Sequence, residues 1–399
     1  MFARKPYIPR LILAIVVTAI ISSAATAAFM RYSLYGGALE DLRQVDFDKF
    51  ARVFKIVTEE YVDPVSSSQV MDGALSGMVD SLKDPYSQYL TAQQYREMKI
   101  HTTGTYSGIG VYVGMRDGYV TVIAPIKGSP AEKAGLRAQD RIIRVDGKDI
   151  AGLPIDEVVS LIKGKKGTKV VLTVERPGVE APFDVEVVRS IVEVDPVIWE
   201  ITTSGKGKKI GYVRITEFNE HAYEKTKNAV ERLLDQKVEG LLLDLRQNPG
   251  GLLDQCLKVA GIFVPEGPVV EVVGRGGKKR VFRSEGPGVE LPLVVLVDHG
   301  SASASEILAG AIRDRGVGLL LGMRTFGKGL VQSLIEVGDD TAVKITSARY
   351  YTPDGISING TGIEPDIVVE LPPEEVPKEP SAGFDPQVKK ALEVLDSER

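Results

Sequence analysis

The chain of 399 residues is long enough for two or three domains with substantial cores. Its contents of 43% apolar and 26% charged residues are those of a globular protein, and its net charge of −5 argues against general affinity for nucleic acids. The single cysteine, Cys256, excludes an intrachain disulfide and a cysteine metal cluster. Its apolar helical setting predicts a buried core residue and not a reactive thiol.

The amino-terminal end differs in character from the rest of the chain. Arg4, Lys5 and Arg10 precede an uncharged run at residues 11–30, which spans about 30 Å of hydrocarbon as a helix. Basic residues before such a run keep the N-terminus cytoplasmic and send the following chain across the membrane. A cleaved signal peptide, with Ala25-Thr26-Ala27 as its A-x-A site, is the alternative. The length of the run favours an uncleaved anchor, and both interpretations predict an extracytoplasmic body, on the periplasmic or cell-surface side.

Apolar residues recur at helical spacing through the next part of the chain. Residues 47–61 carry them on one face, and residues 71–82 predict a second helix. The sequence Asp84-Pro85-Tyr86-Ser87 ends that helix, and residues 91–98 suggest a third. These helices predict a small arm that either packs on the main body or associates with another copy of the chain.

Short strand-like segments separated by turn residues follow in residues 101–190. They include GIGV, YVTV, SPAEKAGL and AQDRI, with a helix at 154–162. This combination resembles a circularly permuted PDZ domain. Such domains add a chain end as an extra strand and hold its carboxylate on backbone amides. The resemblance implies that Ile109, Gly110 and Val111 supply these amides, because glycine lets the backbone approach closely. Without the resemblance, GIGV would be read as a bulge or turn.

From Asp195 onward, strands and helices alternate. A strand at 210–215 and a helix at 222–234 lead to the apolar strand at 241–245, which ends in the sequence RQNPGG. This alternation predicts an α/β sheet with helices on its faces and a ligand site where the strands end. Gly250 and Gly251 can present unhindered N–H groups there, although Pro-Gly-Gly is also an ordinary start to a helix.

Residues 291–332 hold the strongest candidate for chemistry. An apolar strand at 293–297 leads into Ser301, Ser303 and Ser305, and the apolar spacing that follows indicates a helix. The serines therefore lie where a strand turns into a helix, whose N-terminal N–H groups suit a developing negative charge. After a second strand at 317–321 comes a lysine between two glycines, in FGKG.

A serine hydroxyl needs a base to become a nucleophile. The histidines at positions 101, 221 and 299 are poorly placed for a Ser-His-Asp triad, which is the less favoured alternative. A lysine can act instead if burial lowers its pKa from about 10.4 by several units. Lys328 has apolar neighbours, and Gln332 is neutral, so it can orient the amine without restoring its charge.

The block GSASASEILAGAIRD followed by TFGKGLVQ resembles the carboxyl-terminal processing proteases, or tail-specific proteases, which are Ser/Lys serine endopeptidases. The resemblance also includes DLRQNPGG and YYTPDGISINGTGIEPDIVVE, and it covers roughly residues 40–371. It implies that the nucleophile is Ser303, that the general base is Lys328 and that Gln332 holds the lysine. No cofactor or metal is implied.

The same resemblance implies further site residues. The oxyanion hole would be formed by the amide of Ala304 and by a glycine amide of the preceding loop, and the choice between Gly250 and Gly251 stays open. The family places an activity-related aspartate at Asp314. Asp314 and Glu306 are the charged residues nearest the nucleophile, and we interpret both as supports for the loop and helix and not as proton carriers, while a direct role stays open. Thr325, three residues before the lysine, is a candidate hydroxyl partner. The family also favours self-association through the helical arm.

The whole sequence therefore predicts a multi-domain α/β protein with an α/β protease core, an inserted PDZ-like β-rich domain and an N-terminal helical arm. The predicted parts are an anchor or signal (1–30), a helical region (31–100), a PDZ domain (101–190), a protease core (191–371) and a linker with a last helix (372–399). The predicted function is a serine endopeptidase that recognises C-terminal tails of extracytoplasmic proteins. Its partners would be protein substrates with free C-termini, the membrane and further copies of the chain, without nucleic acid. The alternatives are a catalytically silent PDZ scaffold and a hydrolase or transferase of a non-peptide acyl group.

Overall fold

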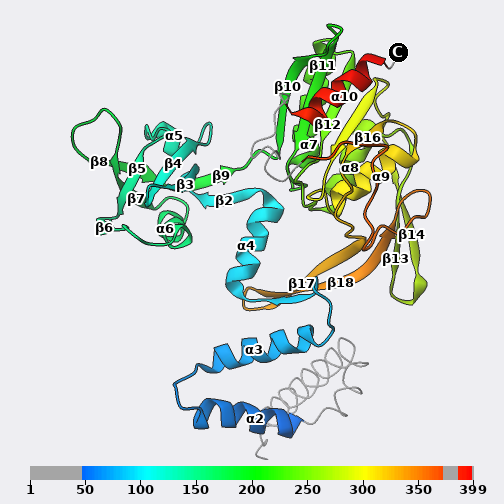
Figure 1. Ribbon diagram of the computed structural model, residues 1–399. Coiled ribbons are helices and arrows are strands. Elements are labelled where there is room, and N and C mark those ends of the chain that lie inside the picture. Colours follow the sequence, from blue (N-terminus) through cyan, green and yellow to red (C-terminus); the bar gives the residue numbers. More distant parts are fainter. Residues whose placement is uncertain (1–46, 372–384, 398–399) are drawn as a thin grey trace, which may run out of the picture. The chain divides into compact units, whose positions relative to one another are not determined.

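Residues 47–371 and 385–397 are described by the computed structural model, and they divide into two compact units between Ser81 and Leu82 (Figure 1). The predicted anchor or signal at 11–30 lies outside the described residues. Within the described ranges, no helix is both long enough and apolar enough to cross a bilayer. The predicted multi-domain α/β class is confirmed.

The first unit contributes two helices, α2 (Phe47–Glu60) and α3 (Ser67–Asp80). They cover the two segments whose apolar spacing predicts helices. Neither helix buries a side chain, and apolar residues of α2 such as Val53 and Ile56 are 53% and 58% exposed. Among the described residues, this pair therefore has an apolar face but no core of its own.

Helix α4 (Ala92–Thr103) belongs to the second unit, whereas the sequence placed it with the other helices in residues 31–100. Its residue Tyr95 is buried against Leu90 and Ala342, which lies about 250 positions further along the chain. This contact ties α4 to the larger unit. Helical spacing reports that a face is apolar but not which part of the chain covers it.

A β-rich domain is inserted between two paired strands. Strand β2 (Thr105–Gly108) pairs antiparallel with β9 (Ser190–Glu193), so the chain enters and leaves this domain at neighbouring points. The domain has its own apolar core, separate from that of the protease sheet. Its strands are β3 (Val111–Arg116), β4 (Tyr119–Pro125), β5 (Arg141–Val145), β6 (Lys148–Asp149), β7 (Lys169–Glu175) and β8 (Phe183–Val188), with helices α5 (Pro130–Lys133) and α6 (Ile155–Ile162). The main sheet runs β3-β4-β5-β7-β8 and is antiparallel.

The predicted protease core, from Asp195 onward, is built on a six-stranded sheet in the order β10-β11-β12-β15-β16-β19. The strands are β10 (Val197–Thr203), β11 (Lys209–Ile215), β12 (Gly240–Asp244), β15 (Leu293–Val297), β16 (Leu319–Gly322) and β19 (Ile367–Val368). All neighbours pair in parallel except β10 with β11. The carboxyl ends of β12 and β15 therefore meet at one edge of the sheet, where a site is expected.

Helices cover both faces of this sheet. Three helices, α7 (Ala222–Asp235), α8 (Leu253–Phe263) and α9 (Ala304–Asp314), share one core cluster, whereas α10 (Pro386–Ser397) packs on the opposite face (Figure 1). Strand β12 shows why both faces need cover. Because side chains alternate along a strand, Leu241 and Leu243 point to the three-helix face and Leu242 points to α10.

A second sheet contains the strand that follows Lys328. Its main path is β1-β18-β13-β14, and β17 pairs with β18. The strands are β1 (Gln88–Leu90), β13 (Gly267–Gly274), β14 (Lys279–Ser284), β17 (Leu330–Gly338) and β18 (Thr341–Tyr351), with a short 3-10 turn, η1 (Arg275–Gly277). The sequence interpretation found β18 but missed β17, which begins two residues after Lys328.

Candidate active site

Ser303 occupies a strained turn directly before α9. Its backbone has φ 55° and ψ −112°, a conformation with positive φ that residues other than glycine rarely adopt. Ser301 locks the turn, because its hydroxyl donates to the carbonyl of Leu245 at 2.9 Å and accepts from the N–H of Asp298 at 3.0 Å. The strand-turn-helix position predicted for the serines is thus what the structure shows.

Ser303 and Lys328 line one cavity of about 400 Å³. Ala304, Gly250, Gly251 and Gln332 line it as well. The structure therefore brings together all the residues predicted to carry out the chemistry, from three separate parts of the chain.

Glu306 holds the serine and lysine segments together. This carboxylate is fully buried, and its Oε2 atom accepts from the N–H groups of Ser303 and Lys328, each at 2.9 Å. Its Oε1 atom accepts from the N–H of Gly327 at 2.8 Å and from the hydroxyl of Thr325 at 2.6 Å. The predicted supporting role of Glu306 thus has a structural basis, and the partner of Thr325 is Glu306 and not the lysine.

Tyr350 makes a second link, which the sequence did not reveal. Its hydroxyl lies 3.0 Å from the carbonyl oxygen of Ser303 and also contacts the carbonyl oxygen of Lys328. Burial raises the pKa of Tyr350 well above its usual value, and the negative charge of Glu306 acts in the same direction. The phenol therefore keeps its proton, and its single O–H group faces the carbonyl oxygens of both segments.

Lys328 is placed where its charge is disfavoured. Burial lowers the pKa of this amine, and the nearby charge of Lys344 lowers it further, while Glu306 and Asp84 act against the change. Its Nζ atom lies 5.1 Å from the centroid of the Tyr86 ring. The Asp84-Pro85-Tyr86-Ser87 segment, interpreted from the sequence only as a helix stop, thus contributes to the surroundings of the lysine.

Gln332 lies on β17 with its side-chain amide directed at β18. Its Nε2 atom donates to the hydroxyl of Thr346 at 3.4 Å. Within residues 47–371, no hydrogen bond joins Gln332 to Lys328, so its role in holding the lysine stays a prediction.

The two glycines after β12 have different hydrogen-bonding states. The N–H of Gly250 donates to the side-chain oxygen of Asn248 at 2.9 Å, whereas the N–H groups of Gly251 and Ala304 have no acceptor in the described part of the chain. Gly251 is therefore the better candidate for the second oxyanion donor. Gly250 is needed for space, because a Cβ there would lie 2.8 Å from the nitrogen of Ala304.

Asp314 sits at the other end of α9, about 16 Å of helix from Ser303. Its carboxylate accepts from Arg313 Nη2 at 2.9 Å and from the N–H of Asp354 at 3.1 Å. It therefore anchors the C-terminal end of α9 to the turn after β18. That Asp314 does not carry a proton in the reaction stays a prediction.

One histidine lies nearer the site than its sequence position suggested. His101, at the end of α4, lines the same cavity as Ser303. Its side chain is 81% exposed, and its Nδ1 atom lies 3.9 Å from a carboxylate oxygen of Glu217. This placement follows from the packing of α4 on the protease core and makes His101 the imidazole to test against Lys328.

The predicted carboxylate loop of the PDZ domain lies between β2 and β3. The carbonyl of Gly110 accepts from the hydroxyl of Ser129 at 2.9 Å, and the carbonyl of Ile109 accepts from the N–H of Ala131 at 2.8 Å. The phenol of Tyr106 lies against the N–H groups of Gly110 and Val111; burial raises the pKa of Tyr106, and these hydrogen bonds oppose the rise. The N–H groups of Gly110 and Val111 thus lie at the phenol oxygen of Tyr106.

Beside this loop, a groove runs between β3 and α6. Its apolar lining includes Val111, Val113, Val159 and Ile162. An added peptide strand would place alternate side chains against such a surface.

Comparisons with known proteins agree with this geometry. Peptidase family S41 matches residues 209–369, a PDZ domain matches 121–176, and the activating protease CtpB N-terminal domain matches 26–94. The carboxy-terminal processing protease CtpA of Bacillus subtilis is 37% identical over 366 residues, which cover 91% of this chain and 78% of that protein. The carboxy-terminal-processing protease of Bartonella bacilliformis is 39% identical over 332 residues, covering 81% and 75%.

Among solved structures, a Bacteroides fragilis protein assigned to the S41 proteases shares the fold, with 18% identity and a TM-score of 0.53, covering 86% of this chain and 96% of that one. Fold and matches together define a serine-type peptidase that carries a PDZ domain. The chain belongs to the carboxy-terminal processing proteases of peptidase family S41, as the resemblance in its sequence predicted.

Proposed function

We propose that the protein is an endopeptidase that cleaves peptide bonds through a Ser303/Lys328 dyad. The neutral amine of Lys328 takes the proton from the hydroxyl of Ser303, and the freed oxygen attacks the scissile carbonyl. The N–H groups of Ala304 and Gly251 stabilise the oxyanion. The amine returns its proton to the leaving nitrogen, and water then releases the acyl group from Ser303 by the same route.

The observation that carries this proposal is the pair of links between the serine and lysine segments. Glu306 binds the N–H groups of Ser303 and Lys328, and Tyr350 contacts both of their carbonyl oxygens. Two backbones joined at both their donors and their acceptors cannot move apart independently. Such fixed placement of a nucleophile and its base is what proximity contributes to catalysis.

We further propose that the PDZ domain recruits C-terminal tails of extracytoplasmic proteins. The names of the relatives describe proteases that process carboxyl termini, and the Ile109–Val111 amides with the neighbouring apolar groove would bind a free chain end. The uncharged run at residues 11–30 would anchor the protein to the cytoplasmic membrane.

Self-association through the helical arm is also part of the proposal. The exposed apolar side chains of α2 would be covered by the same helices of another copy. Analytical ultracentrifugation of the chain with and without the double substitution Val53→Asp, Ile56→Asp tests self-association. The same particle mass in both proteins would contradict self-association through α2.

Cleavage of matched peptides with free and amidated C-termini tests the function. Ser303→Ala and Lys328→Ala should each lose activity almost completely, whereas His101→Ala should retain it. Full activity of Lys328→Ala would exclude the lysine as the base. If His101→Ala then lost activity, the imidazole of His101 would be the base instead. Equal cleavage of free and amidated peptides would contradict tail recognition but leave the peptidase chemistry intact.

A further inference from the structure

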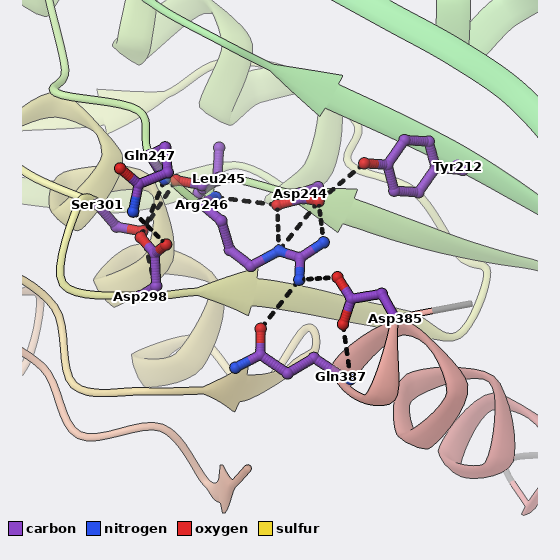
Figure 2. A network of polar contacts seen from close by, with 9 residues as sticks. All are labelled: Tyr212, Asp244, Leu245, Arg246, Gln247, Asp298, Ser301, Asp385 and Gln387. Carbon is purple, nitrogen blue, oxygen red and sulfur yellow. Dashed lines mark hydrogen bonds and ion pairs between the residues drawn. The ribbon is translucent and has the colours of Figure 1, made fainter. Parts of the chain in front are cut away.

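The C-terminal segment reaches into the protease core through a buried ionic network (Figure 2). Asp385 precedes α10 and Gln387 lies in its first turn. The Nη1 atom of Arg246 pairs with the carboxylate of Asp385 and donates to Oε1 of Gln387 at 3.0 Å. On its other side, Arg246 donates from Nη2 to Asp244 at 2.6 Å.

The four residues of this network named above are withdrawn from water. Asp244 and Gln387 are fully buried, and Arg246 and Asp385 are 2% and 6% exposed. Burial alone would lower the pKa of Arg246, but the charges and hydrogen bonds of Asp244 and Asp385 outweigh it and raise the pKa. Removing one partner of such a group leaves a buried charge without compensation, so the guanidinium is held firmly in place.

The alternation of β12 places Asp244 on the α10 face, and Asp244 holds the guanidinium of Arg246, which lies in the turn after the strand. Leu242 packs on the α10 face, and Asp244 and Arg246 follow it at intervals of two residues. Tyr212 from the neighbouring strand donates to Asp244 at 2.8 Å on the same face. Asp385 therefore acts at the point where β12 ends and the glycine loop begins.

The loop that follows Arg246 connects directly to the nucleophile. The carbonyl of Asn248 accepts from the N–H of Ala302 at 3.0 Å and from the hydroxyl of Ser305 at 2.9 Å, on the two sides of Ser303. The side-chain oxygen of Asn248 holds the N–H of Gly250. A displacement of Arg246 would therefore move Asn248, and with it the residues on both sides of Ser303 and the N–H of Gly250.

We infer that the C-terminal segment is a working part of the active site, with Asp385 as a positioning residue. Asp385 orients Arg246, and Arg246 sets the loop that presents the N–H of Gly251 to the oxyanion. The inference rests on the proposed Ser303/Lys328 mechanism. Loss of the Asp385 carboxylate should therefore weaken stabilisation of the transition state more than binding of substrate.

Asp396, at the other end of the same helix, provides a matched control. Its carboxylate accepts from the hydroxyl of Ser204 and from the N–H of Lys206 at 3.0 Å, so it also anchors α10, but at a turn remote from the glycine loop. Comparing Asp385→Asn with Asp396→Asn in the full chain therefore separates a general loosening of α10 from an effect on the loop.

The experiment measures kcat and KM for a peptide, the affinity for a peptide aldehyde that forms a tetrahedral adduct, and the melting temperature. For Asp385→Asn we expect kcat to fall about tenfold to a hundredfold with KM changed less than about twofold, as for a displaced oxyanion donor. The affinity for the peptide aldehyde should fall in parallel with kcat. Asp396→Asn should lower the melting temperature with kcat within about twofold of the wild type.

Asp385→Glu, which keeps the carboxylate, should recover most of kcat. If Asp385→Asn does not fold, Gln387→Met carries the test, because it removes the other acceptor of Nη1 and leaves the charges. An unchanged kcat in the folded variant, or equal losses in Asp385→Asn and Asp396→Asn, would overturn the inference while Ser303→Ala remains inactive. If the Ser303→Ala variant still cleaved the peptide, the proposed mechanism would be overturned, and the inference with it.

Discussion

Two glycine loops in this chain are suited to offer backbone N–H groups to an oxygen that bears negative charge, and the structure holds them by different means. The protease loop begins at Arg246, which is fixed between two buried carboxylates, and Asp298 accepts from the N–H of Gln247 at 2.9 Å. The PDZ loop is held by neutral groups: the hydroxyl of Ser129 and the N–H of Ile126, at 3.0 Å, both donate to the carbonyl of Gly110.

Under the proposed function, this difference matches the lifetime of the charge that each loop would meet. An oxyanion exists only near the transition state, so its donors must already be in place when it forms. A peptide carboxylate is a stable charge that can bind and draw its amides together. We therefore expect damage to the protease loop to appear in kcat and damage to the PDZ loop to appear in KM.

The largest effect is expected from Gly251→Ala. A Cβ there would lie 2.4 Å from the carbonyl oxygen of Phe218, at a φ of 141°. The loop must shift, and kcat should fall by about a hundredfold or more with KM little changed. Gly355→Ala is the control, because its φ of 78° is also positive but its Cβ would meet open space. Similar losses in both variants would contradict a specific role for the Gly251 amide.

Tyr350→Phe should have the next largest effect. It removes the hydroxyl that contacts the carbonyl oxygens of Ser303 and Lys328. The carbonyl of Ser303 keeps the N–H of Ile307 as a donor at 3.0 Å, whereas that of Lys328 loses its donor, at a cost of about 1–3 kcal/mol. We expect kcat to fall about tenfold, since small displacements of reacting groups are costly. Tyr351→Phe, on the other side of the same strand, is the control for kcat and for thermal stability. If the two variants behave alike, Tyr350 does not position the dyad.

Gly110→Ala is the matching change in the PDZ loop. A Cβ there would lie 2.4 Å from the Cβ of Ser129, so the loop must open. We expect KM for a peptide with a free C-terminus to rise about fivefold, the value of roughly one hydrogen bond, with kcat unchanged. The KM for the amidated peptide should not change in Gly110→Ala. The control is Gly118→Ala in the same domain, whose Cβ would meet open space and which should leave the KM for both peptides unchanged. A fall in kcat would mean that the two loops are coupled.

The sequence predicts best those parts of the site whose partners are close along the chain. The strand at 293–297 matches β15 residue for residue, and the serine turn and the start of α9 follow from local spacing. The family motif supplied Ser303 and Lys328. In contrast, Tyr350 reaches Ser303 across 47 positions and Asp385 reaches Arg246 across 139.

Such long-range contacts have no periodicity or motif that a single sequence displays. They arise because pairing of β17 with β18 and packing of α10 on the sheet bring remote residues together. His101 is placed beside the cavity for the same reason. The missed strand β17 did carry a signal, since the residues LVQSLIEVG are rich in β-branched and apolar types.

The smallest expected effect concerns the pH at which Lys328 becomes a base, and two substitutions should move it in opposite directions. The charge of Lys344 lowers the pKa of Lys328 and that of Asp84 raises it. Because activity requires the neutral amine, the rate rises as pH passes through this pKa. Lys344→Met should therefore move the acid limb of kcat/KM to higher pH and Asp84→Asn to lower pH, each by about half a unit. Both shifts should be smaller in 1 M salt, because the Debye length there is only about 3 Å and the charges are screened from one another. Shifts of the same sign, or none, would indicate that the group titrating on the acid limb is not Lys328.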